Sequence, residues 1–141
     1  MKRYEGTRID VTFDPARCLH AAECVRGLPE VFDTRRRPWI QPDGAAPDVV
    51  AEVVRRCPTG ALHYAAPGAA EEPVQPTTVD ARPGGPLFLR GDLRLRTEAG
   101  EVSDVRAALC RCGATGNDPF CDASGPCKDW HHQDRTPAAE G

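Results

Sequence analysis

Short stretches of alternating hydrophobic and polar residues mark the strands of the first half of the chain. Ile9, Val11 and Phe13 alternate with polar neighbours, and this pattern predicts a half-buried strand. Residues 61–64 predict a strand that returns beside it, and residues 39–40, which lie between two prolines, predict a short edge strand. The pattern therefore predicts a strand near each end of this half.

Two helices are predicted between these strands. Residues 21–26 form a short helical stretch that Gly27 and Pro29 would close. Pro47 suits the first turn of a longer helix, because proline lacks the N–H that this position leaves without a partner. One face of this helix is expected to be apolar, with Val49, Val50, Val53 and Val54.

The second half has a different pattern, in which leucines alternate around turn residues. Strands are predicted around Leu87, Leu89, Leu93 and Leu95. Gly91-Asp92 and residues 98–101 are turn candidates, and residues 105–109 predict a further strand. We therefore expect a small β-rich module here.

The two halves are joined by a stretch that shows no apolar periodicity. Residues 66–86 contain five prolines and three glycines, a composition typical of an extended linker. We predict an α+β protein with a first module over residues 1–66, a linker over 67–83, a second module over 84–132 and a disordered tail over 133–141.

Composition and charge narrow the function classes. The 141 residues carry a net charge of −3, so no bulk basic field favours nucleic acid as a partner. The chain begins with charged residues, and no run approaches the roughly 18 apolar residues of a membrane span, so we expect neither a signal peptide nor a membrane partner. The arginines at 35–37 are expected to form a solvated loop, with a docking surface for an acidic redox partner as the alternative.

Seven cysteines suggest how such small modules are stabilised. Modules of about 50 to 65 residues bury little surface and usually need a metal, disulfides or a partner. In the cytoplasmic, reducing location that we expect, clustered cysteines indicate metal or redox chemistry more often than disulfides.

The first cysteine group contains Cys18, Cys24 and Cys57. The loop between the first two can wrap an inorganic core, and Cys57-Pro58 can close the site from far along the chain. Backbone N–H groups at Thr59 and Gly60 are expected to point at sulfur and stabilise a negative cluster.

This module resembles the single-cluster bacterial ferredoxins. The resemblance is closer to a divergent mono-cluster ferredoxin family, and it is carried by the segments CLHAAECVRGLPEVFD, RRPWI and CPTGAL. In the ferredoxins a third cysteine stands where this chain has Ala21, and loss of that thiolate accompanies a 3Fe–4S cluster. The resemblance implies a 3Fe–4S or 4Fe–4S cluster held by the three cysteines. His20 is a candidate fourth ligand, with an ordinary surface histidine as the alternative.

The second cysteine group reads C110-R-C112 and then C121-D. The Cys-x-Cys pair can bind one iron with two adjacent thiolates. With the preceding strands, ALCRCG and NDPFCD resemble the CDGSH iron–sulfur family across roughly residues 84–125. That resemblance implies a 2Fe–2S cluster held by Cys110, Cys112 and Cys121 with a histidine as the fourth ligand.

The chain departs from this family at the fourth ligand. Gly125 stands at the histidine position and Ala123 at the usual glycine. Cys127 is the expected substitute, because thiolate is a good soft ligand for iron, and His131 and His132 are second choices. A zinc site with four cysteines and a site without a complete cluster remain alternatives.

These patterns predict a two-cluster protein that carries single electrons to a partner reductase or oxygenase. No nucleophile–base pair, phosphate-binding glycine loop or paired carboxylates indicate an enzyme with its own substrate. The alternatives are an iron–sulfur cluster donor or redox sensor, and a structural module with zinc in the C-terminal site. A second copy of the chain is another candidate partner, since CDGSH-type modules often pair into dimers.

Overall fold

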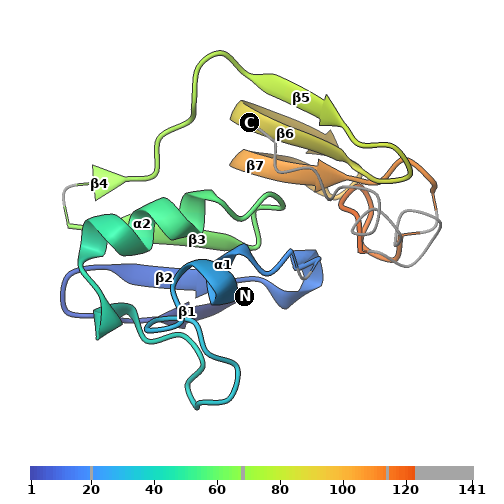
Figure 1. Cartoon of the computed structure of the whole chain (residues 1–141). Coiled ribbons are helices and arrows are strands. Elements are labelled where there is room, and N and C mark those ends of the chain that lie inside the picture. The colour runs from blue at the N-terminus through green and yellow to red at the C-terminus, as the bar shows by residue number, and fades with distance from the viewer. Residues whose placement is uncertain (20, 68, 114, 123–141) are drawn as a thin grey trace. The chain divides into compact units, whose positions relative to one another are not determined.

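The structure, a computed structural model, describes residues 1–19, 21–67, 69–113 and 115–122. The chain divides into two compact units, Met1–Glu72 and Pro73–Gly141 (Figure 1). Each unit contains its own antiparallel sheet. The two α-helices of the described residues belong to the first unit.

The first unit is built on a sheet in the order β1-β2-β3-β4, in which all neighbours are antiparallel. The strands are β1 (Lys2–Tyr4), β2 (Asp10–Phe13), β3 (Leu62–Ala66) and β4 (Ala69–Ala70). Strand β2 pairs with β3, so the predicted strands at the two ends of this module do meet. Strand β1 lies in the charged N-terminal stretch, where we predicted no strand.

Helix α2 (Pro47–Arg55) packs against β3 and fills the core of this unit (Figure 1). Val50, Val53 and Val54 are buried, as expected from their spacing. Val49, which we predicted on the same face, is 39% exposed. At about 100° per residue, Val49 lies about 100° from Val50 and about 140° from Val54 around the helix, at the edge of the buried face.

The remaining core side chains come from β2, β3 and the loops, and the short helix α1 (Glu23–Gly27) packs the partly buried Cys24 and Val25 against them. This helix begins later than predicted, because Ala22 has a left-handed backbone with φ of 65° and precedes its first turn. Residues 39–40 do not form the predicted edge strand. Ile40 makes a single bridge to Phe32 and is buried with it, so this stretch contributes packing to the core and no sheet edge. Two 3-10 turns, Pro15–Arg17 and Pro42–Gly44, complete the unit.

The second unit is a three-stranded sheet in the order β5-β6-β7. Its strands are β5 (Thr78–Ala81), β6 (Leu87–Thr97) and β7 (Gly100–Leu109). The predicted turn at residues 98–101 is confirmed, since Thr97 pairs with Gly100 at the tip of the β6–β7 hairpin. The turn predicted at Gly91-Asp92 is wrong. Strand β6 continues through Gly91, where the register shifts and forms a bulge.

Part of the predicted linker belongs to this second sheet. Thr78–Ala81 lies within residues 67–83, yet it forms β5 and pairs with β6 from Thr78 opposite Arg90 to Ala81 opposite Leu87. All four residues of β5 are exposed, which explains why their sequence shows no buried apolar pattern. An edge strand of this kind is held by backbone pairing more than by side-chain burial.

None of the helices in the described residues is long and apolar enough to cross a membrane.

Candidate metal centres

The loop that presents Cys18 is shaped by Asp14 and Pro15. The carboxylate of Asp14 caps the turn Pro15–Arg17 by accepting a hydrogen bond from the backbone N–H of Ala16 at 3.0 Å. The N–H of Cys18 then donates to the carbonyl of Pro15 at 3.3 Å. The chain thus leaves β2 and turns once before it reaches the first cysteine.

The other two cysteines of this group lie at helix boundaries. Cys24 is in the first turn of α1, two residues after the left-handed Ala22. Cys57 follows α2, and its N–H donates to the carbonyl of Val54 at 3.0 Å. Since Val54 is fully buried, the position of Cys57 is determined by the core of the unit.

These three thiols converge on one small cavity. Cys18, Cys24 and Cys57 all line a space of about 30 Å³, together with Phe13 and Trp39. Burial and, to a smaller extent, the nearby Cys57 and Cys18 together raise the pKa of the Cys24 thiol to about 11. A cationic metal centre would reverse this effect, because it favours the thiolate form. The thiols therefore fit a shared cluster.

Thr59 and Arg17 tie the two cysteine loops together behind this cavity. The Thr59 hydroxyl lies 3.6 Å from the sulfur of Cys57 and accepts a hydrogen bond from the N–H of Ala61 at 3.1 Å. The buried Arg17 guanidinium donates from Nη2 to the carbonyl of Thr59 at 2.8 Å. One positive charge is thus held between the segment before Cys18 and the segment after Cys57.

Cysteine, histidine, aspartate and glutamate side chains do not gather in threes around a single metal ion anywhere in the described residues. The ligands of a multi-iron cluster bind different irons, so they need to surround a space and not one point. Cys18, Cys24 and Cys57 line one such space.

The second cysteine group is organised by the end of β7. The sulfurs of Cys110 and Cys112 are 3.7 Å apart, and the N–H of Gly113 donates to the sulfur of Cys110 at 3.2 Å. Two thiolates on one tetrahedral metal, with metal–sulfur bonds of about 2.3 Å, lie roughly 3.8 Å apart. This pair therefore fits a single iron or zinc ion.

Cys121 returns beside β7 through a loop closed by polar side chains. A bridge joins Leu109 to Phe120, and the N–H of the buried Cys121 donates to the carbonyl of Ala108 at 2.9 Å. Within the loop, the Thr115 hydroxyl donates to the carbonyl of Phe120 at 2.6 Å. The described part of the site thus contains three cysteines on two adjoining segments.

Two further side chains hold the ends of this site. The carboxylate of Asp122 accepts a hydrogen bond from the N–H of Gly116 at 2.9 Å. Arg111 donates from Nε to the carbonyl of Gly85 at 2.9 Å and from Nη2 to the carbonyl of Arg82. Arg111 therefore fastens the Cys-x-Cys segment to the turn that precedes β6.

Several predicted ligands lie outside the described residues. They are His20 of the first site and Cys127, His131 and His132 of the second, and the same holds for Ala123 and Gly125. Their roles remain predictions.

Sequence reasoning missed Arg17 and the aromatic wall of the first site. An arginine beside a cysteine carries no sign that it will be buried, because arginine is usually exposed. The sequence pattern predicts an edge strand at Trp39, but its ring packs edge-on against Phe13 with 5.1 Å between ring centroids. The proximity of two aromatic residues 26 positions apart could not be read from spacing.

Comparison with known proteins agrees with both cysteine groups. Residues 4–67 match the family described as divergent 4Fe-4S mono-cluster, and residues 84–124 match the iron-binding zinc finger of CDGSH type. The chain belongs to the divergent mono-cluster family and adds a CDGSH-type domain. The predicted fusion of these two domains is confirmed.

Two relatives are similar to part of this two-domain protein. Both carry the name "Uncharacterized protein YjdI", one from Escherichia coli strain K12 and one from Escherichia coli O157:H7. Each is 46% identical over 61 residues, which cover 43% of this chain and 80% of the relative. No solved structure matches the chain.

Proposed function

We propose that this protein is a two-cluster, one-electron carrier that serves a partner reductase or oxygenase. The observation that carries the proposal is the convergence of Cys18, Cys24 and Cys57 on one cavity, in a unit separate from the one that contains the second cysteine group. Iron–sulfur clusters change charge by one electron with little rearrangement when ligands and hydrogen-bond donors are already in place.

In the mono-cluster domain, the three cysteines would hold a 3Fe–4S or 4Fe–4S cluster within an α+β, ferredoxin-like fold. His20 is a candidate fourth ligand. The chain contributes an aromatic cavity wall through Phe13 and Trp39. Arg17 supplies a buried positive charge near the cluster, and such a charge favours the reduced, more negative state.

In the CDGSH-type domain, Cys110, Cys112 and Cys121 would hold a 2Fe–2S cluster with Cys127 as the fourth ligand. The N–H of Gly113 donates to the sulfur of Cys110, and such a bond would stabilise the negative charge of a cluster held there. A site with four cysteines is more negative than one with a histidine, so its reduction potential is expected to be lower. We infer no catalytic role for either site, and a cytoplasmic location suits their thiols.

A cluster donor or redox sensor is the second candidate, and the exposure of Cys112 favours it. Cys110 is half-buried and Cys112 is exposed, so an acceptor protein can reach these thiolates. Reversible one-electron reduction without loss of iron supports the carrier. Transfer of iron and sulfide to an apo-acceptor supports the donor.

The test is anaerobic purification of the full chain, followed by iron, sulfide and zinc analysis and electron spin resonance. We expect two cluster signals, and Cys57→Ser should remove the first while the second persists. Zinc without iron in the C-terminal site would support the structural alternative. Loss of both signals in Cys57→Ser would contradict the assignment of two independent sites.

A further inference from the structure

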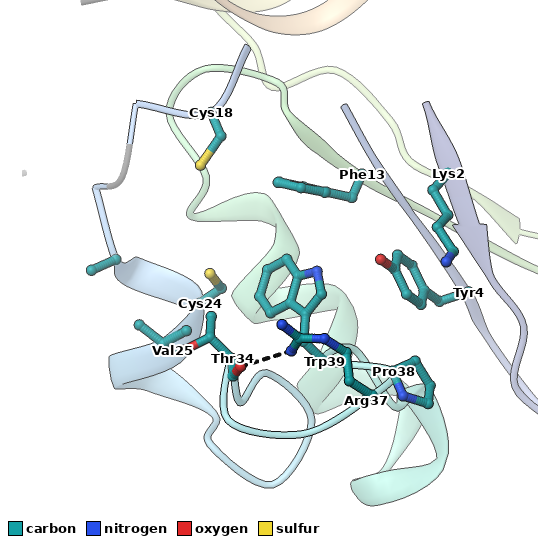
Figure 2. A pocket seen from close by; sticks show the side chains of 11 residues that line it. Lys2, Tyr4, Phe13, Cys18, Cys24, Val25, Thr34, Arg37, Pro38 and Trp39 are labelled. Carbon is teal, nitrogen blue, oxygen red and sulfur yellow. Dashed lines mark hydrogen bonds between the residues drawn. The ribbon is translucent and has the colours of Figure 1, made fainter. Parts of the chain in front are cut away.

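A second and larger cavity, of about 530 Å³, lies beside the cysteines of the mono-cluster domain. Cys18 and Cys24 line it on one side of the Trp39 indole, and Lys2 and Tyr4 line it on the other (Figure 2). A molecule that occupies this cavity would therefore contact the same residues that hold the cluster.

The charged residues of this cavity are cations. Lys2 and Arg37 are both exposed, and the Lys2 ammonium lies 5.4 Å from the ring centroid of Tyr4. Within the described part of the chain, no aspartate or glutamate lines the cavity. The chain as a whole has a net charge of −3, so this local positive charge runs against the overall balance.

The loop that carries Arg37 keeps this positive charge in place. Nη1 of Arg37 donates to the carbonyls of Thr34 at 2.9 Å and Arg36 at 2.7 Å, and the first of these bonds is drawn in Figure 2. The charge of Arg35 is offset by an ion pair with Asp33, in which Nε of Arg35 lies 3.0 Å from Oδ1 of Asp33. The guanidinium of Arg37 is thus oriented by neutral carbonyl groups, and its charge remains available to an anionic partner.

The floor of the cavity is apolar and aromatic. Tyr4, Phe13 and Trp39 contribute rings, and Val25 and Pro38 contribute aliphatic surface. Tryptophan, tyrosine and arginine dominate the binding energy of protein–protein interfaces, where an apolar centre is surrounded by a polar rim. An aromatic floor with two cations at its edge has this composition.

We propose that this cavity is the docking surface for an acidic redox protein. Carboxylates of the partner would pair with Lys2 and Arg37, while an apolar side chain of the partner would cover Trp39. The inference rests on the proposed carrier function and specifies the partner's charge and its contact surface. One electron leaves the reduced cluster of the mono-cluster domain, and the partner's centre is reduced by that same electron.

The test measures electron transfer from the full, cluster-loaded chain to two haem proteins of opposite charge. The chemically reduced chain is mixed with ferric cytochrome b5, which is acidic, or with ferric cytochrome c, which is basic. Haem reduction is followed by stopped-flow absorbance. With the double variant Lys2→Glu/Arg37→Glu, we expect the rate to the acidic acceptor at low salt to fall at least about tenfold. The difference should disappear at about 1 M salt, where the Debye length is roughly 3 Å.

Two controls separate the docking surface from other effects. Arg55→Glu reverses an exposed charge on α2 outside the cavity. The electron-transfer rate of this variant should differ from that of the wild type by less than about twofold. Cys57→Ser removes the first cluster, so its rate gives the contribution of the second. Electron spin resonance of every variant checks that the remaining cluster is intact.

Each outcome has a distinct meaning. If the wild type cannot be reduced reversibly, the proposed carrier function fails before docking is tested. If it is reduced but the double variant behaves like Arg55→Glu, the docking inference is overturned and the carrier function stands. If the double variant instead changes the sedimentation coefficient of the chain, the surface joins two copies of this protein, and the inference is likewise overturned.

Discussion

The hydroxyl of Thr59 allows a sharp test of how the Cys57 loop is held. Thr59 is 2% exposed, and its hydroxyl accepts a hydrogen bond from the N–H of Ala61, which is 1% exposed. Thr59→Val keeps the shape of the side chain and removes the acceptor. The N–H of Ala61 would then be buried without that acceptor.

The expected loss in the free energy of unfolding follows from the burial of this hydrogen bond. A buried donor left without an acceptor costs about 1–3 kcal/mol. Thr59→Ser is the matched control, because it keeps the hydroxyl and removes one methyl group, worth about 0.8 kcal/mol. We therefore expect valine to lower the free energy of unfolding more than serine, although valine has the greater apolar volume.

The assay is urea unfolding of the metal-free full chain, monitored by Trp39 fluorescence in a Trp130→Phe background. In a domain of this size, each kcal/mol lowers the melting temperature by about 4–8 °C, so thermal unfolding gives a second measure. If the valine variant is as stable as the serine variant or more so, the hydroxyl does not hold this loop. In the cluster-loaded protein, loss of the hydroxyl beside the Cys57 sulfur should also lower the reduction potential of the first cluster.

Two further predictions concern the metal-free protein and the second sheet. Because the folded pKa of Cys24 is raised from 9.0 to about 11, the stability that its protonated thiol contributes is complete below pH 9 and is lost as the pH rises through about 11. Urea midpoints from pH 8 to 11 should show this loss, and Cys24→Ala should lack it; an unchanged slope in that variant would contradict the assignment to Cys24. In the second unit, a Cβ at Gly91 would overlap the Thr77 side chain and lie 2.8 Å from the Thr77 Cα. Gly91→Ala should therefore lower the free energy of unfolding of this unit by roughly 1–3 kcal/mol. Gly100→Ala is its control, since both glycines have positive φ and a Cβ at Gly100 meets nothing within 4 Å; equal losses of the melting temperature measured by circular dichroism would exclude overlap as the cause.

The elements that could be predicted are those with a simple local pattern. The alternation of Ile9, Val11 and Phe13 matches β2, and Pro47 with its valines matches α2. The elements that could not be predicted depend on distant partners. Strand β5 has no buried side chain, so its only signal is the backbone pairing with β6 that the folded sheet supplies.

The candidate sites show the same division between local and distant information. The cysteines could be selected from their spacing and from resemblance, because iron–sulfur ligation needs thiolates in particular places. The contact of Arg17 with Thr59 could not, since it joins residues 42 positions apart through a backbone carbonyl. A carbonyl is present at every residue, so nothing in the amino-acid type of Thr59 identifies it as an acceptor.

The attachment of Cys57 to the end of α2 has a consequence for maturation of the protein. The apolar packing of α2 on β3 needs no inorganic component, so the polypeptide can fold first and receive iron and sulfide afterwards. Iron and sulfide delivered to the folded chain would then find Cys57 already held in place by the core of the unit.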